Sequence, residues 1–195
     1  MKILGVTGGV GAGKSTVLKY LEEAYGACVI QADQVGHEVM EPGETAYEKI
    51  LRYFGPQILS EDLRIDRGIL GAIVFADPDK LKALNAIVHP AVKKEILRRI
   101  AWAEAEGKAC AVVEAALFLE EKYDAFCGET WYIYTNEDER RRRLRESRGY
   151  TDERIGQIFG NQKSHEEFVS RCTYVIDNNG TAEDTCRQID KRMRE

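Results

Sequence analysis

The sequence predicts an α/β fold in which five parallel strands form a doubly wound sheet. Three observations support this prediction. A glycine-rich run near the start of the chain lies between an apolar segment and a helical pattern, and short apolar runs then alternate with helical segments. One gap between apolar runs is far longer than the others, which predicts a helical insertion between two strands.

The first strand and helix flank a phosphate-binding pattern. The apolar run 3–6 precedes Gly8-Gly9-Val10-Gly11-Ala12-Gly13-Lys14-Ser15, which fits glycine, any four residues, glycine, lysine, and serine or threonine. Glycines let backbone N–H groups wrap the phosphates, Lys14 reaches the terminal phosphates, and the Ser15 hydroxyl is placed to bind Mg²⁺. A chance match in a glycine turn is the alternative, and the flanking strand and helix argue against it. The predicted nucleotide-binding residues are Gly11, Ala12, Gly13, Lys14, Ser15 and Thr16.

The later elements follow from the same patterns. The helix that begins at about Ser15 has apolar residues at helical spacing and is expected to stop at Gly26. Further strands are predicted at four apolar runs, residues 28–30, 109–113, 131–134 and 174–176. Helices are predicted over residues 80–88, 91–106, 137–147 and 181–193. We expect a single domain over residues 1–195, with a helical insertion at about 34–108 that Pro90 interrupts.

Composition narrows the class of protein. The 195 residues carry a formal net charge of −5, and the pI is near 5.4, which argues against nucleic-acid binding as the main activity. The five cysteines lack the close pairs of a zinc site and are expected to be reduced, mostly buried thiols. The sequence has no leader pattern and no apolar run long enough to span a membrane, so a cytoplasmic location is expected.

A carboxylate follows the second predicted strand at Asp33. Residues just past the carboxyl ends of parallel strands face the crevice where ligands bind, so Asp33 is a candidate base for an acceptor hydroxyl. The alternative is an N-cap for a helix that begins near Gln34. The run Asp33-Gln34-Val35-Gly36 also fits a GTPase switch pattern, but it follows the phosphate loop by only one helix, and no Asn-Lys-any-Asp signature accompanies it.

An arginine-rich segment, residues 140–145, follows the fourth predicted strand. Such a helix is commonly a solvated face, and acidic neighbours balance its charge here. One of its arginines could instead reach a transferring phosphoryl group and stabilise the charge that develops there. Spacing leaves open which one. Glu114 is a candidate to hold Mg²⁺ through water, and His89-Pro90 is either a turn or a substrate contact.

Short motifs run along nearly the whole chain. They are residues 7–16, Ala32-Asp33, Glu41-Pro42-Gly43, Phe54-Gly55, Asp66-Arg67 with Leu70, Val74-Phe75, residues 84–90 ending in His89-Pro90, Gln162, and residues 175–180. Together they resemble the dephospho-CoA kinase family. The resemblance implies a P-loop kinase fold, and it implies phosphorylation of the ribose 3′-hydroxyl of dephospho-CoA by ATP, the step that completes coenzyme A synthesis.

The resemblance also implies roles for parts of the chain. The insertion at about 34–108 is expected to hold the CoA moiety, and residues at about 137–168 to form a lid. The lid arginine aligns with Arg142 or Arg143, and Arg143 is preferred. The expected catalytic residues are Asp33 as base, Lys14 and Arg143, the expected substrate-binding residues are Thr7, Asp33 and His89, and the expected ligand of Mg²⁺ is Ser15.

Two segments depart from the family pattern. The family usually has Asp-Ala-Asp where this chain has Gln31-Ala32-Asp33, and Pro-Leu-Leu where it has Ala116-Leu117-Phe118. Two other functions remain open. Another nucleoside or nucleotide kinase would share the loop, the sheet and the lid but use a different acceptor, and a nucleotide-dependent switch protein would hydrolyse its nucleotide when a partner binds. The expected ligands are ATP and dephospho-CoA, with no nucleic acid and no membrane.

Overall fold

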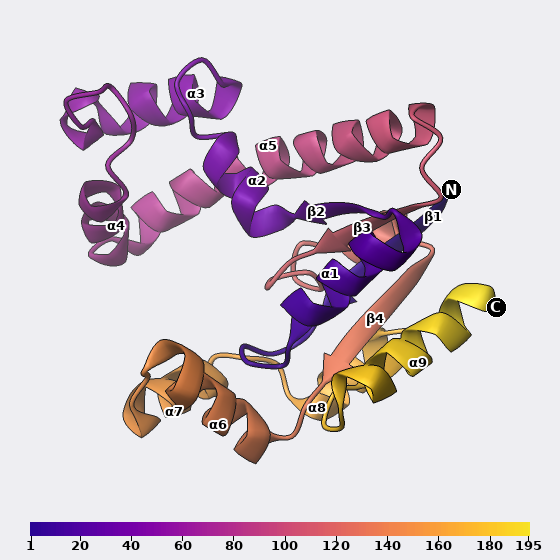
Figure 1. Ribbon diagram of the computed structural model, residues 1–195. Coiled ribbons are helices and arrows are strands. Elements are labelled where there is room, and N and C mark those ends of the chain that lie inside the picture. The colour runs from indigo at the N-terminus through magenta and orange to yellow at the C-terminus, as the bar shows by residue number, and fades with distance from the viewer. The chain divides into compact units, whose positions relative to one another are not determined.

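The structure, a computed structural model, describes all 195 residues and divides into two compact units. The sheet unit comprises Met1–Val29 with Ala103–Glu195, and the helical unit comprises Ile30–Trp102. The boundary between them falls within the second strand. Figure 1 follows the chain through both units by colour.

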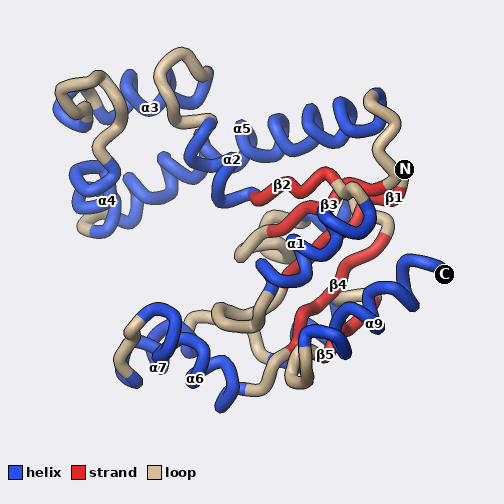
Figure 2. The backbone as a smooth tube through the Cα atoms, in the orientation of Figure 1, coloured by secondary structure: helices blue, strands red, loops and turns tan.

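The sheet has five strands in the order β2-β3-β1-β4-β5. They are β1 (Lys2–Thr7), β2 (Cys28–Gln31), β3 (Cys110–Glu114), β4 (Glu129–Tyr134) and β5 (Tyr174–Asp177), drawn in red in Figure 2. The strands β1 and β3, β1 and β4, and β4 and β5 pair in parallel, so Val6 lies opposite both Glu114 and Trp131. The five predicted strands are confirmed, and each lies within two residues of its expected bounds.

One face of the sheet is covered by α1 (Lys14–Tyr25) and α9 (Ala182–Arg194). Alternate strand residues point to this face, and they form one buried cluster with the apolar residues of the two helices. The hydroxyl groups of Tyr20 and Tyr25 donate to Asp190 at 2.8 and 2.7 Å and tie α1 to α9. As predicted, α1 stops at Gly26, whose φ of 60° lies in the left-handed region that favours glycine.

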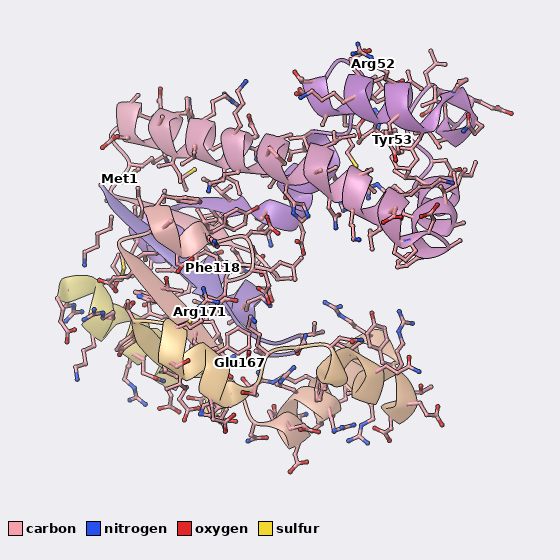
Figure 3. All side chains as sticks on the ribbon, turned by 180° about the vertical axis from the view of Figure 1, so that it is seen from behind. Met1, Arg52, Tyr53, Phe118, Glu167 and Arg171 are labelled. Carbon is pink, nitrogen blue, oxygen red and sulfur yellow. The ribbon has the colours of Figure 1, made fainter.

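The opposite face carries α8 (His165–Arg171) and the connection from β3 to β4, which includes the short 3-10 helix η2 (Tyr123–Phe126). Tyr132 of β4 stacks on Phe168 of α8 with ring centroids 4.6 Å apart. Phe118 of the connection is fully buried and meets β1 at Gly5. Figure 3 shows this side of the molecule, with Phe118, Glu167 and Arg171 labelled.

Two helices follow β4, and their ends carry the expected capping groups. Asn136 accepts a hydrogen bond from the Glu139 amide at the start of α6 (Glu137–Arg148), and Gly149 ends that helix with a φ of 62°. Thr151 accepts from the Arg154 amide at the start of α7 (Asp152–Gly160). The two helices are joined by a short turn and run antiparallel.

The helical unit contains α2 (Ala32–Glu38), α3 (Thr45–Phe54), the 3-10 helix η1 (Pro56–Ile58), α4 (Arg67–Phe75) and all but the last turn of α5 (Pro78–Ala105). Asp66 caps α4 by accepting hydrogen bonds from the amides of Gly68 and Ile69. A compact apolar cluster holds α3, η1 and α4 together, and its buried members are Ile50, Phe54, Ile58, Leu70 and Val74. The amphipathic pattern of these short helices thus gives the unit a core of its own.

The predicted break at Pro90 is wrong, because α5 runs unbroken from Pro78 to Ala105 with Pro90 inside it. Proline removes one helical hydrogen bond and crowds the preceding turn. The apolar spacing nevertheless continues across it. Ile87 and Val88 pack against the unit's core before Pro90, and Val92 and Ile96 are buried after it. Burial on both sides offsets the lost bond.

All five cysteines are free thiols, and only Cys110 is fully buried. Burial raises the pKa of Cys110 to about 11, of Cys127 to about 12 and of Cys172 to about 11.

None of the helices combines the length and the apolar character needed to cross a bilayer.

Gly5→Ala should destabilise the protein, because a methyl group at Gly5 would overlap the ring of Phe118. Overpacking of this kind costs about 1–3 kcal/mol of the free energy of unfolding, measurable by urea denaturation. Phe118→Leu removes the atoms that collide, so the same alanine should cost less in that background. Equal costs in both backgrounds would show that Phe118 is not what restricts Gly5.

Candidate functional site

The phosphate loop connects β1 to α1 and turns sharply at two glycines. Gly11 and Gly13 have φ values of 82° and 86°, in the region that only glycine adopts without strain. A Cβ atom at Gly13 would also overlap the side-chain amide of Asn178. The first turn of α1 follows at once, so its free amides and the positive end of its dipole face the loop.

Lys14 lies across the loop and is largely shielded from solvent. Its Nζ donates to the carbonyl oxygen of Gly8 at 2.9 Å and lies 3.6 Å from Oε1 of Glu114, at the end of β3. Since β1 and β3 are adjacent parallel strands, their carboxyl ends bring the two side chains together. Sequence reasoning considered Glu114 only as a metal ligand, and its contact with Lys14 depends on a strand order that the sequence does not reveal.

The hydroxyl groups near the loop differ in their exposure. Thr7 ends β1, is 1% exposed, and has an Oγ1 atom without a hydrogen-bond partner. Ser15 and Thr16 are exposed in the first turn of α1. A buried hydroxyl without a partner is uncommon and calls for an additional group. Thr7 therefore has unused hydrogen-bonding capacity next to the loop.

The donor set near the loop fits a magnesium ion that arrives with a nucleotide. Nowhere in the chain do three or more His, Cys, Asp or Glu side chains gather to hold a metal. Mg²⁺ commonly takes one or two protein oxygens and completes its shell with phosphate oxygens and water. The exposed hydroxyl of Ser15 and the carboxylate of Glu114 are two protein oxygens beside the loop that suit this role.

Residues that follow β4 and β5 donate hydrogen bonds to the backbone of the loop. Thr135 Oγ1 donates to the carbonyl oxygen of Ala12 at 3.0 Å, and Asn178 Nδ2 donates to the same oxygen at 2.7 Å. Thr185 Oγ1 donates to Asn178 Oδ1 at 2.7 Å, which orients the amide so that its nitrogen faces the loop. The family resemblance suggests Asn178 only as a neighbour of the nucleotide base, and Thr135 carries no sequence signal beyond its place after a strand.

The structure separates the two candidate lid arginines. Arg143 donates to the carbonyl oxygen of Asn178 at 2.9 Å and lies beside Gly13. Arg142 points into an exposed network with Glu139 and Glu146. Hydrogen bonds from Arg142 and then Arg143 lower the pKa of Glu139 to about 2. Of the two, Arg143 is therefore the one that adjoins the loop.

Arg140 is a loop contact that sequence reasoning did not single out. Its Nε donates to the carbonyl oxygen of Val10 at 2.9 Å, and its guanidinium also bonds Gln162 of the segment after α7. Five arginines within residues 140–145 gave no basis for choosing it. Helical spacing did place Arg140 and Arg143 one turn apart, on the same face of α6.

In the helical unit, Asp33 is the second residue of α2 and is exposed. The proposed N-cap role of Asp33 is wrong, since the helix begins at Ala32 and Gln31 occupies the N-cap position. The run Asp33-Gln34-Val35-Gly36 lies within α2 rather than in a loop, so the switch pattern has no structural counterpart. The Asp33 carboxylate makes no hydrogen bond or ion pair and is therefore available.

Of the two alternatives for His89, the turn is wrong, because this half-buried residue lies inside α5. Two cavities open in the helical unit, of about 680 and 280 Å³. The larger lies between α3 and α5, with Lys49, Ile87 and Lys94 among its lining residues, and the smaller includes His37 and Arg67. His37 is one turn after Asp33 on α2, so the smaller cavity lies on the Asp33 side of that helix.

Comparisons with known proteins agree with one another. The family model described as dephospho-CoA kinase matches residues 2–184. A dephospho-CoA kinase of Carboxydothermus hydrogenoformans is 40% identical over 190 residues, covering 97% of this chain and 91% of that protein. The structure of a dephospho-CoA kinase from Campylobacter jejuni is similar with a TM-score of 0.74 and 28% identity, covering 100% of this chain and 97% of the other. A crystal structure of a Thermus thermophilus protein gives a TM-score of 0.81 at 30% identity, covering 99% and 96%.

Proposed function

The chain belongs to the dephospho-CoA kinase family, and from this premise we propose how its residues transfer the γ-phosphoryl group of ATP to dephospho-CoA. The reaction of the family phosphorylates the ribose 3′-hydroxyl and yields coenzyme A and ADP. The observation that carries the proposal is the phosphate loop with Lys14 held across it beside Glu114. Phosphoryl transfer needs mainly positioning and charge neutralisation, which this arrangement can supply.

ATP binds with its phosphates against residues 11–16. The amides at the start of α1 bond the phosphate oxygens, and Lys14 exchanges its contact with Gly8 for the terminal phosphates. The hydroxyl of Ser15 would hold Mg²⁺, and Glu114 would contact it through water. When bound, the ion neutralises phosphate charge and polarises the γ-phosphoryl group.

Asp33 is the base that accepts the proton of the 3′-hydroxyl. Its exposed carboxylate has no competing hydrogen bond. It comes directly after β2 in the chain, and residues just past the carboxyl ends of parallel strands are the ones that face a ligand crevice. A proton accepted as the oxygen attacks keeps charge from accumulating on that oxygen. Thr7 and His89 are proposed as substrate contacts, and for Thr7 the support is its unpartnered buried hydroxyl.

Arg143 stabilises charge that develops on the transferring phosphoryl group. Its guanidinium is anchored at Asn178 and at Glu139, next to Gly13 of the loop. A cation fixed before the reaction needs no reorganisation when charge appears. Residues at about 137–168, which include α6, α7 and the start of α8, form the proposed lid and limit the access of water, which competes with the acceptor. The insertion at about 34–108 holds the CoA moiety.

The acceptor is tested by mass spectrometry after incubation with MgATP and dephospho-CoA, with nucleoside, nucleotide and acceptor-free controls. One phosphate added to dephospho-CoA only, with matching ADP, is the expected result. If only a nucleoside or nucleotide gained phosphate, the protein would still be a kinase, but the assignment of dephospho-CoA as its acceptor would be rejected. ADP release without any phosphorylated product would point to the switch protein and reject the proposal.

Asp33→Asn keeps the size of the side chain and removes the base. We expect kcat to fall by about 10²–10⁴ with little change in the KM for ATP, because only proton transfer is lost. Gln34→Glu, at the next exposed position of α2, is a control for changed charge on this helix. Turnover near that of the unchanged protein in Asp33→Asn would exclude Asp33 as the base.

Arg143→Gln should lower kcat by about 10²–10³, the loss that follows removal of one preorganised donor in acyl-transfer sites. Arg142→Gln removes the same charge one residue away and should have a much smaller effect, since Arg142 is engaged with Glu139 and Glu146. Steady-state kinetics of both variants make the comparison. A larger loss in Arg142→Gln would move the lid role to Arg142.

A further inference from the structure

The phosphate loop rests closely on α6. An added Cβ atom at Gly9 would overlap the guanidinium of Arg140, and one at Gly11 would lie 3.1 Å from the Arg140 carbonyl oxygen and from Leu144. One at Gly13 would lie 3.2 Å from a nitrogen of Arg143. Gly9 differs from the other two because its φ is not in the left-handed region, so only the neighbouring guanidinium restricts this position.

Arg140 and Gln162 together bond both peptide groups of Val10. Arg140 Nε donates to the Val10 carbonyl oxygen at 2.9 Å, and its terminal nitrogen donates to Gln162 Oε1 at 2.5 Å. The Val10 amide donates to the same Oε1 at 3.4 Å. These three groups close a ring of hydrogen bonds, which we call the Val10 clamp.

Arg140 differs in its surroundings from most other arginines of α6. Arg141, Arg142, Arg143 and Arg145 each lie within 4.0 Å of a carboxylate. Arg140 has no such partner, and its guanidinium lies over the ring of Phe159 at 4.0 Å. Burial lowers the pKa of this guanidinium, although arginine stays charged at neutral pH. Its planar fork reaches a backbone carbonyl and an amide oxygen together, which a lysine ammonium group does less well.

We propose that Arg140 is a positioning residue for ATP, which acts with Gln162 by fixing the Val10 peptide and thereby the conformation of the loop after it. The inference rests on the proposed ATP site and adds to it a residue that touches neither substrate. A glycine-rich loop loses conformational entropy when it closes on phosphates. The clamp imposes part of that loss before ATP binds, so the loop is already close to its bound geometry.

The first test compares Arg140→Gln with the unchanged full-length protein by steady-state kinetics and by calorimetric titration with MgADP. We expect the KM for ATP and the Kd for MgADP to rise about tenfold, with the KM for dephospho-CoA unchanged. Arg145→Gln is the control, since Arg145 is an exposed arginine of the same helix that pairs with Asp152 and does not contact the loop. Unchanged nucleotide affinity in Arg140→Gln would overturn the proposal.

The second test uses Gly9, whose added methyl group should push the guanidinium off Val10. Gly9→Ala should reproduce the rise in MgADP Kd seen in Arg140→Gln, and the double variant should be no weaker than either single one. Effects that multiply in the double variant would show that the two residues act separately and would overturn the clamp. Arg140→Lys keeps the charge but has a single donor nitrogen, so its affinity for MgADP should lie between that of Arg140→Gln and that of the unchanged protein.

Melting temperatures separate positioning from a purely structural role. Because Arg140 also packs on Phe159, some loss of thermal stability is expected in its variants. A lower melting temperature with equal rises in both KM values, measured well below the transition, would mean that Arg140 serves only the fold. MgADP binding needs no acceptor, so a failure to phosphorylate dephospho-CoA would reject the proposed function and leave the clamp testable.

Discussion

The carbonyl oxygen of Ala12 is the point on which the geometry of the phosphate loop depends. Thr135 and Asn178, which follow β4 and β5, both donate to it. A loop with glycines at four of its positions has many accessible conformations, and two donors from buried residues on one carbonyl leave few of them. Residues at the ends of β4 and β5 therefore fix the conformation of a loop that follows β1. The order of the strands in the sheet thus determines where the loop amides point.

The elements that local pattern specifies were predictable from the sequence. The strands and α1 are short, apolar or periodic, and bounded by residues with one strong preference, such as Gly26. The prediction at Pro90 was wrong because proline locally favours the end of a helix. In α5, apolar contacts on both sides of Pro90 keep the helix continuous. A turn at His89 fails as an expectation for the same reason. Residues distant in the chain supply those contacts, so no window of sequence around Pro90 contains the information.

The residues of the candidate site also fall into two groups, those that sequence spacing identifies and those that only packing identifies. Lys14 and Ser15 are identified by spacing, because the chemistry of a phosphate loop requires them at fixed positions. The choice between Arg142 and Arg143 depends on which helix face meets the loop, and neighbours on a helix differ by about 100° in direction. Arg140 was missed because the sequence does not distinguish five arginines within six residues. Only the structure shows which of them contacts Val10. Packing, rather than composition, assigns each of them its contact.

The five free thiols acquire a particular meaning in a protein whose substrate itself ends in a thiol. Dephospho-CoA carries a sulfhydryl group at the end of its pantetheine arm, and oxidised forms of such thiols exchange with protein cysteines through the thiolate. Burial raises the pKa values of Cys110, Cys127 and Cys172 to between about 11 and about 12, which lowers their thiolate fraction near neutral pH below that of an exposed cysteine. These side chains are poor nucleophiles toward a disulfide. These three thiols therefore present less thiolate to the arm of the substrate than an exposed cysteine would.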